Sequence, residues 1–175
     1  MAVILLVHDT FIAADSGSVF TYVADLKNET IWQEDINALT FVSEGPLSLG
    51  SRFVETRRTC GVKFRWEFEI TNLVPGREIQ IDSVEARCHY RGGRSFTAMP
   101  GGTRVTEYGE LYLPYVPQLL SRLVALLSRR SLRRAYARLK EIIENQIRAD
   151  AALPPVTLRS RLARRASCWT CWWHK

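Results

Sequence analysis

The sequence lacks the local motifs that mark many catalytic and cofactor sites. Its 175 residues contain no nucleophile elbow, no glycine-rich phosphate loop and no HExxH metal motif. Histidine is also scarce, and its three positions, 8, 89 and 174, lie far apart in the chain. Any active site must therefore be assembled by the fold from scattered polar residues.

The sequence also lacks a long hydrophobic run. No apolar stretch approaches the roughly 18 residues that a membrane-spanning helix needs. The N-terminal residues 1–14 are apolar, but no basic segment precedes them, and His8 and Asp9 interrupt them. Their alternation predicts a β-strand rather than a signal peptide. We therefore expect a cytoplasmic protein without stable membrane insertion.

Cysteine is too sparse and too unevenly placed for a disulfide framework. Cys60 and Cys88 fall in the predicted strand region, whereas Cys168 and Cys171 lie near the C-terminus. Together with His174, the last two offer three ligands, and a structural zinc site normally needs four. We therefore predict no metal site, and no motif in the sequence indicates a cofactor.

The body of the chain has little net charge. Residues 146–175 carry six basic residues and one acidic residue, whereas residues 1–145 carry 18 basic and 17 acidic residues. The basic character belongs mainly to the C-terminal end, so the body is not predicted to bind nucleic acid. We expect a ligand-binding domain over residues 1–150 and a disordered, Arg- and Trp-rich tail over residues 151–175. A weaker alternative is that this tail attaches the protein to an anionic membrane surface.

The order of the predicted elements is the most informative feature of the sequence. One strand and two short helices come first, about five long alternating strands follow, and one long helix ends the body. Gly92-Gly93 interrupts the sixth strand and predicts a bulge or a hairpin tip. The expected strands cover residues 3–13, 39–43, 51–58, 62–71, 78–84, 88–98 and 103–113, and the expected helices begin near 15 or 16, cover 29–36, and cover 113–147.

These elements predict an α+β fold in which a curved antiparallel sheet of about seven strands wraps around the long C-terminal helix. A sheet covered by only one helix tends to enclose a cavity. In the strand over residues 62–71, Phe64, Trp66 and Phe68 alternate with charged residues, so we place these three on the inner face. The same alternation places further side chains inward: Phe53, Glu55, Arg57, Ile79, Ile81, Ser83, Val105, Glu107, Gly109 and Leu111. Provided that Ile12 is buried, the first strand presents Leu6, His8, Thr10 and Ile12 inward as well.

Among the inward side chains, His8, Glu55 and Glu107 are the candidate catalytic residues. A carboxyl group in an apolar pocket has a raised pKa and can act as a general acid or base, and an imidazole or a guanidinium can stabilise an enolate. Less specific interpretations remain: a rim or satisfied core histidine, an ordinary Glu55–Arg57 ion pair on the outer face, a similarly structural Glu107, and tryptophans that only pack. The candidate ligand-binding residues are Trp32, Phe53, Arg57, Phe64, Trp66, Phe68 and Tyr90.

The chain resembles the START/polyketide-cyclase superfamily, also called SRPBCC or helix-grip proteins, from about Phe11 to Glu144. The resemblance rests on the order and spacing of several short pieces: Ile12-Ala13-Ala14, Val19-Phe20, Val23-Ala24-Asp25, Trp32, Gly45-Pro46, Leu49-Gly50-Ser51, Gly61, Pro75-Gly76, Gly102–Thr106 and Leu139–Glu144. It implies a β-α-α-β₆-α fold in which the sheet grips the long helix around a deep hydrophobic cavity. Members include aromatic polyketide cyclases, lipid carriers and plant hormone-binding proteins, and they share no catalytic signature.

We therefore expect a cofactor-independent cyclase of natural-product biosynthesis that binds a hydrophobic polyketide intermediate. The alternative is a non-catalytic carrier or sensor of a lipid or a similar molecule, acting as a monomer or homodimer. An acyl carrier protein is a candidate partner, although the basic side of the long helix more simply indicates a solvated face. The basic residues of this helix are Arg122, Arg129, Arg130, Arg133, Arg134, Arg138 and Lys140.

Overall fold

The computed structural model describes residues 2–59, 62–84, 88–114 and 116–152. The chain divides into two units, residues 1–145 and residues 146–175. The first unit holds the sheet and most of the long helix, together with every predicted site residue. From residue 153 onward the predicted tail lies outside the described residues, as do its cysteines and His174.

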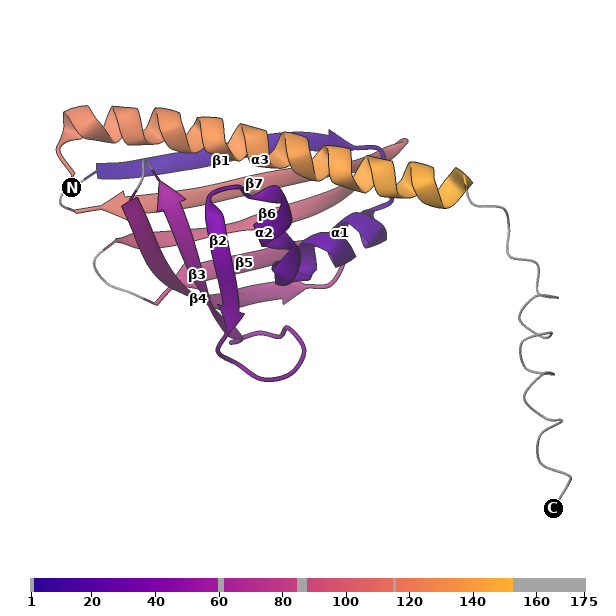
Figure 1. Cartoon of the computed structure of the whole chain (residues 1–175), viewed down its shortest axis with the longest axis horizontal. Coiled ribbons are helices and arrows are strands. Elements are labelled where there is room, and N and C mark those ends of the chain that lie inside the picture. The colour runs from indigo at the N-terminus through magenta and orange to yellow at the C-terminus, as the bar shows by residue number, and fades with distance from the viewer. Residues whose placement is uncertain (1, 60–61, 85–87, 115, 153–175) are drawn as a thin grey trace, which may run out of the picture. The chain divides into compact units, whose positions relative to one another are not determined.

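The first unit is a seven-stranded antiparallel sheet with three helical segments between its first two strands and one long helix at its end (Figure 1). The strand order is β1-β7-β6-β5-β4-β3-β2, so β1 and β2 form the two edges. The elements are β1 (Ala2–Ile12), α1 (Ser16–Ala24), the 3-10 helix η1 (Leu26–Asn28), α2 (Glu29–Trp32), β2 (Ile36–Phe41), β3 (Arg52–Thr59), β4 (Val62–Val74), β5 (Glu78–Ser83), β6 (His89–Met99), β7 (Gly102–Leu113) and α3 (Gln118–Ala152). This architecture confirms the predicted helix-grip fold.

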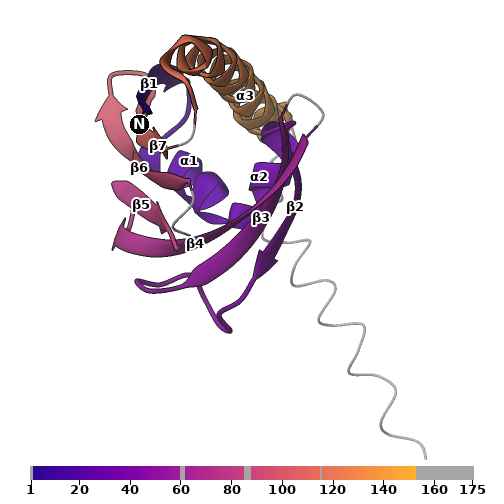
Figure 2. The ribbon, with the colours of Figure 1, turned by 90° about the vertical axis from the view of Figure 1, so that its left-hand side faces the viewer.

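Helix α3 runs along the open side of the curved sheet, between its two edge strands (Figure 2). On one side, Arg129 donates to the carbonyl oxygen of Leu5 and Lys140 donates to that of Phe11, both on β1. On the other side, Arg138 forms an ion pair with Glu34, just after α2. These bonds also occupy carbonyl groups of an edge strand that would otherwise be open to another chain.

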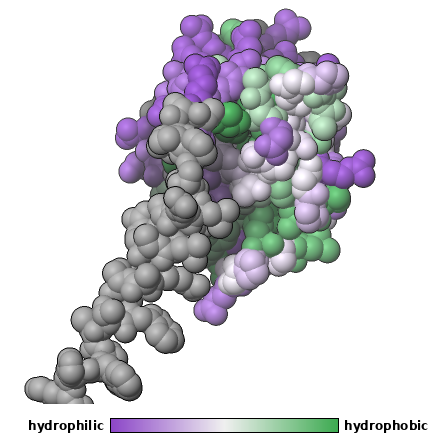
Figure 3. Space-filling model, turned by 90° about the vertical axis from the view of Figure 1, so that its right-hand side faces the viewer, coloured by the Kyte–Doolittle hydropathy of each residue, from purple (hydrophilic) through white to green (hydrophobic). Residues whose placement is uncertain are grey.

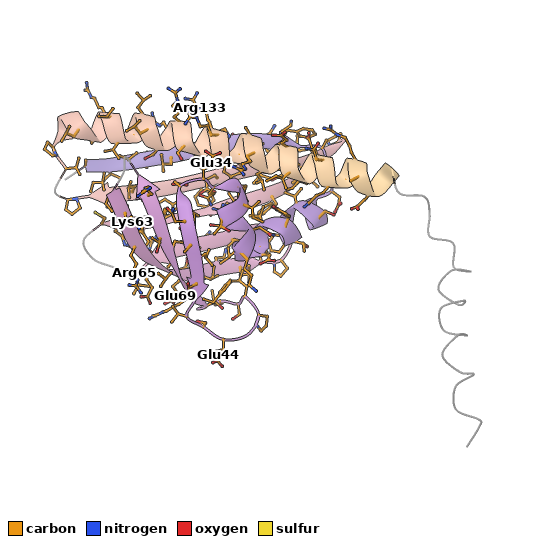
Figure 4. The ribbon with its side chains drawn as sticks, viewed as in Figure 1. Glu34, Glu44, Lys63, Arg65, Glu69 and Arg133 are labelled. Atoms are coloured by element: carbon orange, nitrogen blue, oxygen red, sulfur yellow. The ribbon has the colours of Figure 1, made fainter. Side chains whose placement is uncertain are left out.

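The alternation in β4 sorts its side chains onto two faces, as the sequence predicts. Phe68 and Ile70 are buried, whereas Lys63 and Arg65 between the inward positions are exposed. Arg65 points outward in Figure 4. A register shift against β5 between Ile70 and Asn72 changes the alternation near the end of the strand.

The core lies on the inner face of the sheet. There α1, α2 and residues 135–143 of α3 pack against the strands. Asp15 caps α1, because its carboxylate accepts a hydrogen bond of 2.9 Å from the Ser18 backbone N–H. Helix α1 buries Val19 and Val23. The buried hydrophobic cluster comprises Ile12, Ala14, Val19, Val23, Leu26, Trp32, Phe53, Phe68, Ile70, Ile79, Phe96, Val105, Ala135, Tyr136, Leu139 and Ile143.

Two helix boundaries differ from the prediction. The second short helix ends at Trp32, and Ile36 already begins β2 opposite Arg57. Trp32 and Ile36 are both buried, so their four-residue spacing imitates one face of a helix. The long helix begins at Gln118 rather than near Leu113, because Leu113 is still the last residue of β7.

The prediction of a bulge or hairpin tip at Gly92-Gly93 is wrong. Strand β6 pairs with β5 and β7 through both glycines without a register shift. A Cβ atom at Gly92 would lie 2.5 Å from the hydroxyl oxygen of Tyr90, and one at Gly93 would lie 2.9 Å from that of Tyr108. The glycines therefore make room for tyrosine side chains on the two faces of a regular strand.

Candidate functional site

A cluster of buried polar side chains lies on the inner face of the sheet. Cross-strand pairing sets His8 of β1 opposite Glu107 of β7, and Glu107 opposite Arg94 of β6. Tyr136 of α3 contacts Glu107, and Glu29 of α2 contacts Arg94. Residues from five different elements therefore meet at one place, which only the folded chain can achieve.

Glu107 is the centre of this cluster. Its Oε2 atom accepts hydrogen bonds of 2.6 Å from Arg94 Nε and 2.6 Å from the Tyr136 hydroxyl, and its Oε1 atom accepts one of 3.1 Å from the Tyr90 hydroxyl. Burial, reinforced by the charge of Glu107, raises the pKa of Tyr90 and of Tyr136 well above the ordinary value. Both tyrosines are therefore neutral donors near pH 7.

Arg94 links Glu107 to a second buried carboxyl group, that of Glu29. Its Nη1 atom donates to Glu29 Oε1, while Gln33 Nε2 donates to Glu29 Oε2 at 3.0 Å. Burial raises the pKa of Glu29 to about 7, and the nearby charge of Glu55 adds to this rise, although Arg94 opposes it. Glu29 can therefore hold or release a proton near neutral pH.

Glu55 and Arg57 form a neighbouring pair on β3. Arg57 Nε donates to Glu55 Oε2 at 2.7 Å, and Arg57 Nη1 forms an ion pair of 3.1 Å with Asp35. Glu55 is fully buried, whereas the side chain of Arg57 is a quarter exposed. Burial alone would lower the pKa of Arg57, but Glu55 and Asp35 raise it further than burial lowers it, so the guanidinium stays charged.

His8 and Trp32 border the cluster on two sides. The Nε2 atom of His8 lies 2.9 Å from the hydroxyl of Thr10, and its ring lies 5.2 Å from that of Tyr136. Burial lowers the pKa of His8 despite the opposing charge of Asp9, so its imidazole is neutral near pH 7. The Trp32 ring packs edge-on against Tyr136 at 5.4 Å and lies 5.1 Å from the Arg94 guanidinium.

Tyr90 reaches Glu107 by lying across two facing glycines. Gly92 and Gly109 are opposite each other on β6 and β7. A Cβ atom at either position would lie 2.5 Å from the Tyr90 hydroxyl oxygen. The missing side chains thus create the room in which Tyr90 extends along the sheet toward the carboxylate.

The inner face becomes more exposed toward the start of β4. Along the inward side of this strand, the exposed fraction rises from 3% at Phe68 to 45% at Phe64, and the partly buried Trp66 lies between them. Arg57, opposite Phe64 on β3, is also partly exposed. We call this region, defined by Arg57, Phe64 and Trp66, the open end of the inner face.

Two surface depressions lie away from this cluster. One has a volume of about 610 Å³ and involves Ser16, the β4–β5 turn and β6. The other, about 400 Å³, lies between η1 and the residues around Phe41 to Leu47. None of the predicted site residues lines either depression, so the cavity predicted between sheet and helix remains a prediction.

The predicted inward registers are confirmed, and they bring most candidate residues together. His8, Glu107, Tyr90 and Trp32 lie in or beside the cluster, whereas Glu55 and Arg57 form the neighbouring pair. Glu55 and Arg57 lie on the inner face, not the outer one. Phe53 and Phe68 pack together in the core with ring centroids 5.5 Å apart, and Trp66 stacks on Phe68 at 5.9 Å.

Sequence reasoning missed three members of the cluster: Glu29, Arg94 and Tyr136. The alternation from Tyr90 predicts an inward Arg94 only if β6 runs straight through Gly92-Gly93. Tyr136 belongs to the apolar stripe of α3, so the pattern identified it only as a core residue. Glu29 begins a helix of a single turn, whose orientation the sequence does not reveal.

The architecture is that of a helix-grip protein, and comparison with known families agrees. Residues 5–144 match the family described as "Polyketide cyclase / dehydrase and lipid transport", so the chain belongs to that family. A search of curated proteins finds no match.

Among the described residues, no helix is long and apolar enough to cross a membrane, and no group of three or more potential ligands could hold a metal ion.

Solved structures share this fold at low sequence identity. The Zhui aromatase/cyclase from Streptomyces sp. R1128 has a TM-score of 0.75 and 14% identity, covering 87% of this chain and 100% of that one. TTHA0849 from Thermus thermophilus has a TM-score of 0.70 and 22% identity, covering 79% and 96%. A START superfamily protein from Mycobacterium smegmatis has a TM-score of 0.67 and 14% identity, covering 81% and 98%. At these identities the likeness establishes the fold alone.

Proposed function

We propose that this protein is a cofactor-independent cyclase that binds a hydrophobic polyketide intermediate along the inner face and directs its ring closure. The observation that carries the proposal is the buried cluster of titratable groups on an inner face whose more exposed end carries the aromatic side chains Phe64 and Trp66. The aromatic side chains suit a hydrophobic ligand, and the titratable groups suit proton transfer. Natural-product biosynthesis in the cytoplasm is the setting that this activity implies.

The proposed reaction needs only proton transfers. A base removes a proton from a carbon between two ketones. The resulting enolate carbon then attacks the carbonyl carbon of another ketone further along the chain. A carbon–carbon bond forms to the carbonyl carbon of that ketone while its C=O π bond breaks, and the carbonyl oxygen takes up a proton to become an alcohol. Loss of water from this alcohol then leads toward an aromatic ring, so no oxidant or reductant is required.

We assign the base to neutral His8 or to Glu55, because each presents an atom that can accept a proton. His8 has a lowered pKa, and among the described residues Glu55 finds a hydrogen-bond donor for only one of its two oxygens. Arg57, which is charged and partly exposed beside Glu55, is suited to stabilising the enolate oxygen. Glu107 already accepts three hydrogen bonds, so its proposed contribution to acid–base chemistry acts chiefly through Tyr90, Arg94 and Tyr136.

The activity can be tested with an alkyl 3,5,7-trioxo-octanoate, a short poly-β-ketone that also cyclises slowly without enzyme. We expect the protein to accelerate cyclisation and to shift the product pattern seen by liquid chromatography and mass spectrometry. His8→Asn and Glu55→Gln should lower turnover by about 10²–10⁴-fold while changing binding far less. Glu107→Gln should also lower turnover, and Glu69→Gln, on the outer face beside Arg52, is the control that should not.

The second candidate function is a carrier or sensor of a lipid or a similar hydrophobic molecule. It is favoured by the predominance of apolar side chains on the inner face and by the extensive pairing of its charged groups. A wild-type protein that binds the triketone ester but leaves its cyclisation rate unchanged would support this function. The same result would contradict the cyclase proposal for substrates of this class.

We further propose an acyl carrier protein as the partner that delivers the substrate. Residues 118–140 of α3 contain seven basic residues and no acidic residue, which suits an acidic carrier protein. Arg133 points away from the sheet in Figure 4, and the face in Figure 3 is hydrophilic along its top. The oligomeric state that accompanies this arrangement is proposed to be a monomer or homodimer.

A further inference from the structure

Two fully buried polar atoms beside the cluster have no hydrogen-bond partner among the described residues. They are the Nε1 atom of Trp32 and the Oε1 atom of Glu55, and both residues have an exposed fraction of 0%. Buried polar groups are nearly always paired, and an unpaired one destabilises the folded state. Two such atoms in one region therefore require an explanation.

The two atoms are chemically complementary. The indole nitrogen of Trp32 can only donate a hydrogen bond. The Oε1 atom of Glu55 is left as an acceptor, because Arg57 donates to the other carboxylate oxygen at 2.7 Å. A single small group that both accepts and donates would satisfy the pair, and a hydroxyl group is the simplest such group.

The surrounding contacts hold both side chains in place. Trp32 lies between the Tyr136 ring and the Arg94 guanidinium, and Glu55 is tied to Arg57. Glu29 accepts a hydrogen bond from Arg94, on whose guanidinium the Trp32 ring packs, and the charge of Glu55 acts on the Glu29 carboxyl group. Glu55 also pairs across the strands with Trp66, at the open end of the inner face.

We propose that Trp32 Nε1 and Glu55 Oε1 form a subsite for a hydroxyl group of the bound ligand, which is a phenol, an enol or an alcohol. In this subsite the ligand oxygen accepts the Trp32 N–H, and the ligand hydrogen is donated to Glu55 Oε1. A ketone or an ether would satisfy only Trp32, and an alkyl group would satisfy neither atom. The inference rests on the proposed function, since it requires a ligand on the inner face.

This subsite would also sharpen the proposed substrate class. A poly-β-ketone offers a hydroxyl group only as its enol, whereas the cyclised product carries ring hydroxyl groups. The subsite therefore selects enolised or hydroxylated intermediates over fully ketonic chains. In the carrier alternative, it selects hydroxylated apolar molecules over hydrocarbons of the same shape.

The test compares two probes of similar size, 2-naphthol and 2-methylnaphthalene, by isothermal titration calorimetry. Wild-type protein should bind 2-naphthol at least about tenfold more tightly, because 2-methylnaphthalene leaves the buried pair unsatisfied. Trp32→Phe and Glu55→Leu should each reduce this preference, because each leaves only one atom of the pair, and the double variant should bring it to near unity. Trp66→Phe is the matched control, since it also removes an inner tryptophan but should retain the preference.

A second readout keeps the proposal testable if a variant does not fold. In the wild-type protein, the indole N–H resonance of Trp32 should shift on addition of 2-naphthol and stay in place with 2-methylnaphthalene. Equal affinities together with an unchanged indole resonance would overturn the subsite and indicate that water satisfies these atoms. Failure of both probes to bind would instead overturn the proposed function from which the inference starts.

Discussion

Replacing Arg94 with methionine is expected to lower the free energy of unfolding by about 3–5 kcal/mol at pH 7. Its side chain is only 11% exposed and donates to both Glu29 and Glu107, which are themselves buried. Methionine fills much of the same volume but leaves these carboxyl groups without the guanidinium. The measurement is urea denaturation followed by circular dichroism, with wild type and variant compared in one buffer.

The matched control is Arg91→Met on the same strand. The side chain of Arg91 is 70% exposed and pairs with Asp82 at the surface, so its loss should change stability by less than about 1 kcal/mol. The deficit of Arg94→Met should also shrink at lower pH, because protonation neutralises the uncompensated carboxylates. Equal losses for the two variants would contradict the central electrostatic role assigned to Arg94.

Glu29 should make the protein less stable as the pH rises toward 8. Its pKa is about 7 in the folded protein, whereas the ordinary value is 4.5, so the folded state holds its proton more tightly than the unfolded state. The stabilisation is complete below the ordinary pKa and is lost as the pH rises through the folded value. A difference of this size corresponds to about 3 kcal/mol.

Glu29→Gln isolates this contribution, because the amide carries no titrating proton. Between pH 5 and pH 8, wild-type stability should fall relative to the variant by about 3 kcal/mol, measured by urea denaturation at each pH. Glu34→Gln, whose side chain is 71% exposed, should follow the wild-type curve. Parallel curves for wild type and Glu29→Gln would mean that Glu29 does not hold a proton near neutral pH.

The sheet was predictable because its strands follow simple rules. Phe64, Trp66 and Phe68 alternate with charged residues, and this pattern determines which side of β4 faces inward. Antiparallel pairing then carries the same orientation to β3, so Glu55 and Arg57 point inward with Trp66 and Phe64. A one-residue slip would have inverted all of these positions, and the buried aromatic rings oppose it.

The missing parts of the site depend on contacts that no local pattern encodes. The hydroxyl of Tyr136 meets Glu107 across 29 residues of sequence, and Arg94 meets Glu29 across 65. At Gly92-Gly93, the sequence signal for a bulge arises instead from the space that Tyr90 and Tyr108 require. The space that side chains need on the two faces of a strand depends on the tertiary structure. The two adjacent glycines alone therefore suggest a bulge that the strand does not contain.

The reaction itself does not follow from the fold, because helix-grip proteins of one architecture serve different functions. The proposed chemistry therefore depends on individual side chains of the inner face. His8 is neutral near pH 7 and Glu55 Oε1 has no partner among the described residues, whereas Glu107 already accepts three hydrogen bonds. For this reason His8 or Glu55 is the proposed base, whereas Glu107 is proposed to act through its hydrogen-bond donors.

The proposed function requires that a ligand binds on the inner face, next to the polar cluster. The sharpest test is to record intermolecular nuclear Overhauser effects between bound 2-naphthol and isotopically labelled protein. We expect contacts with Phe64, Trp66 and Tyr90 on the inner face. Contacts confined to the depression lined by Ser16, Arg77 and Thr97 would show that the ligand binds elsewhere.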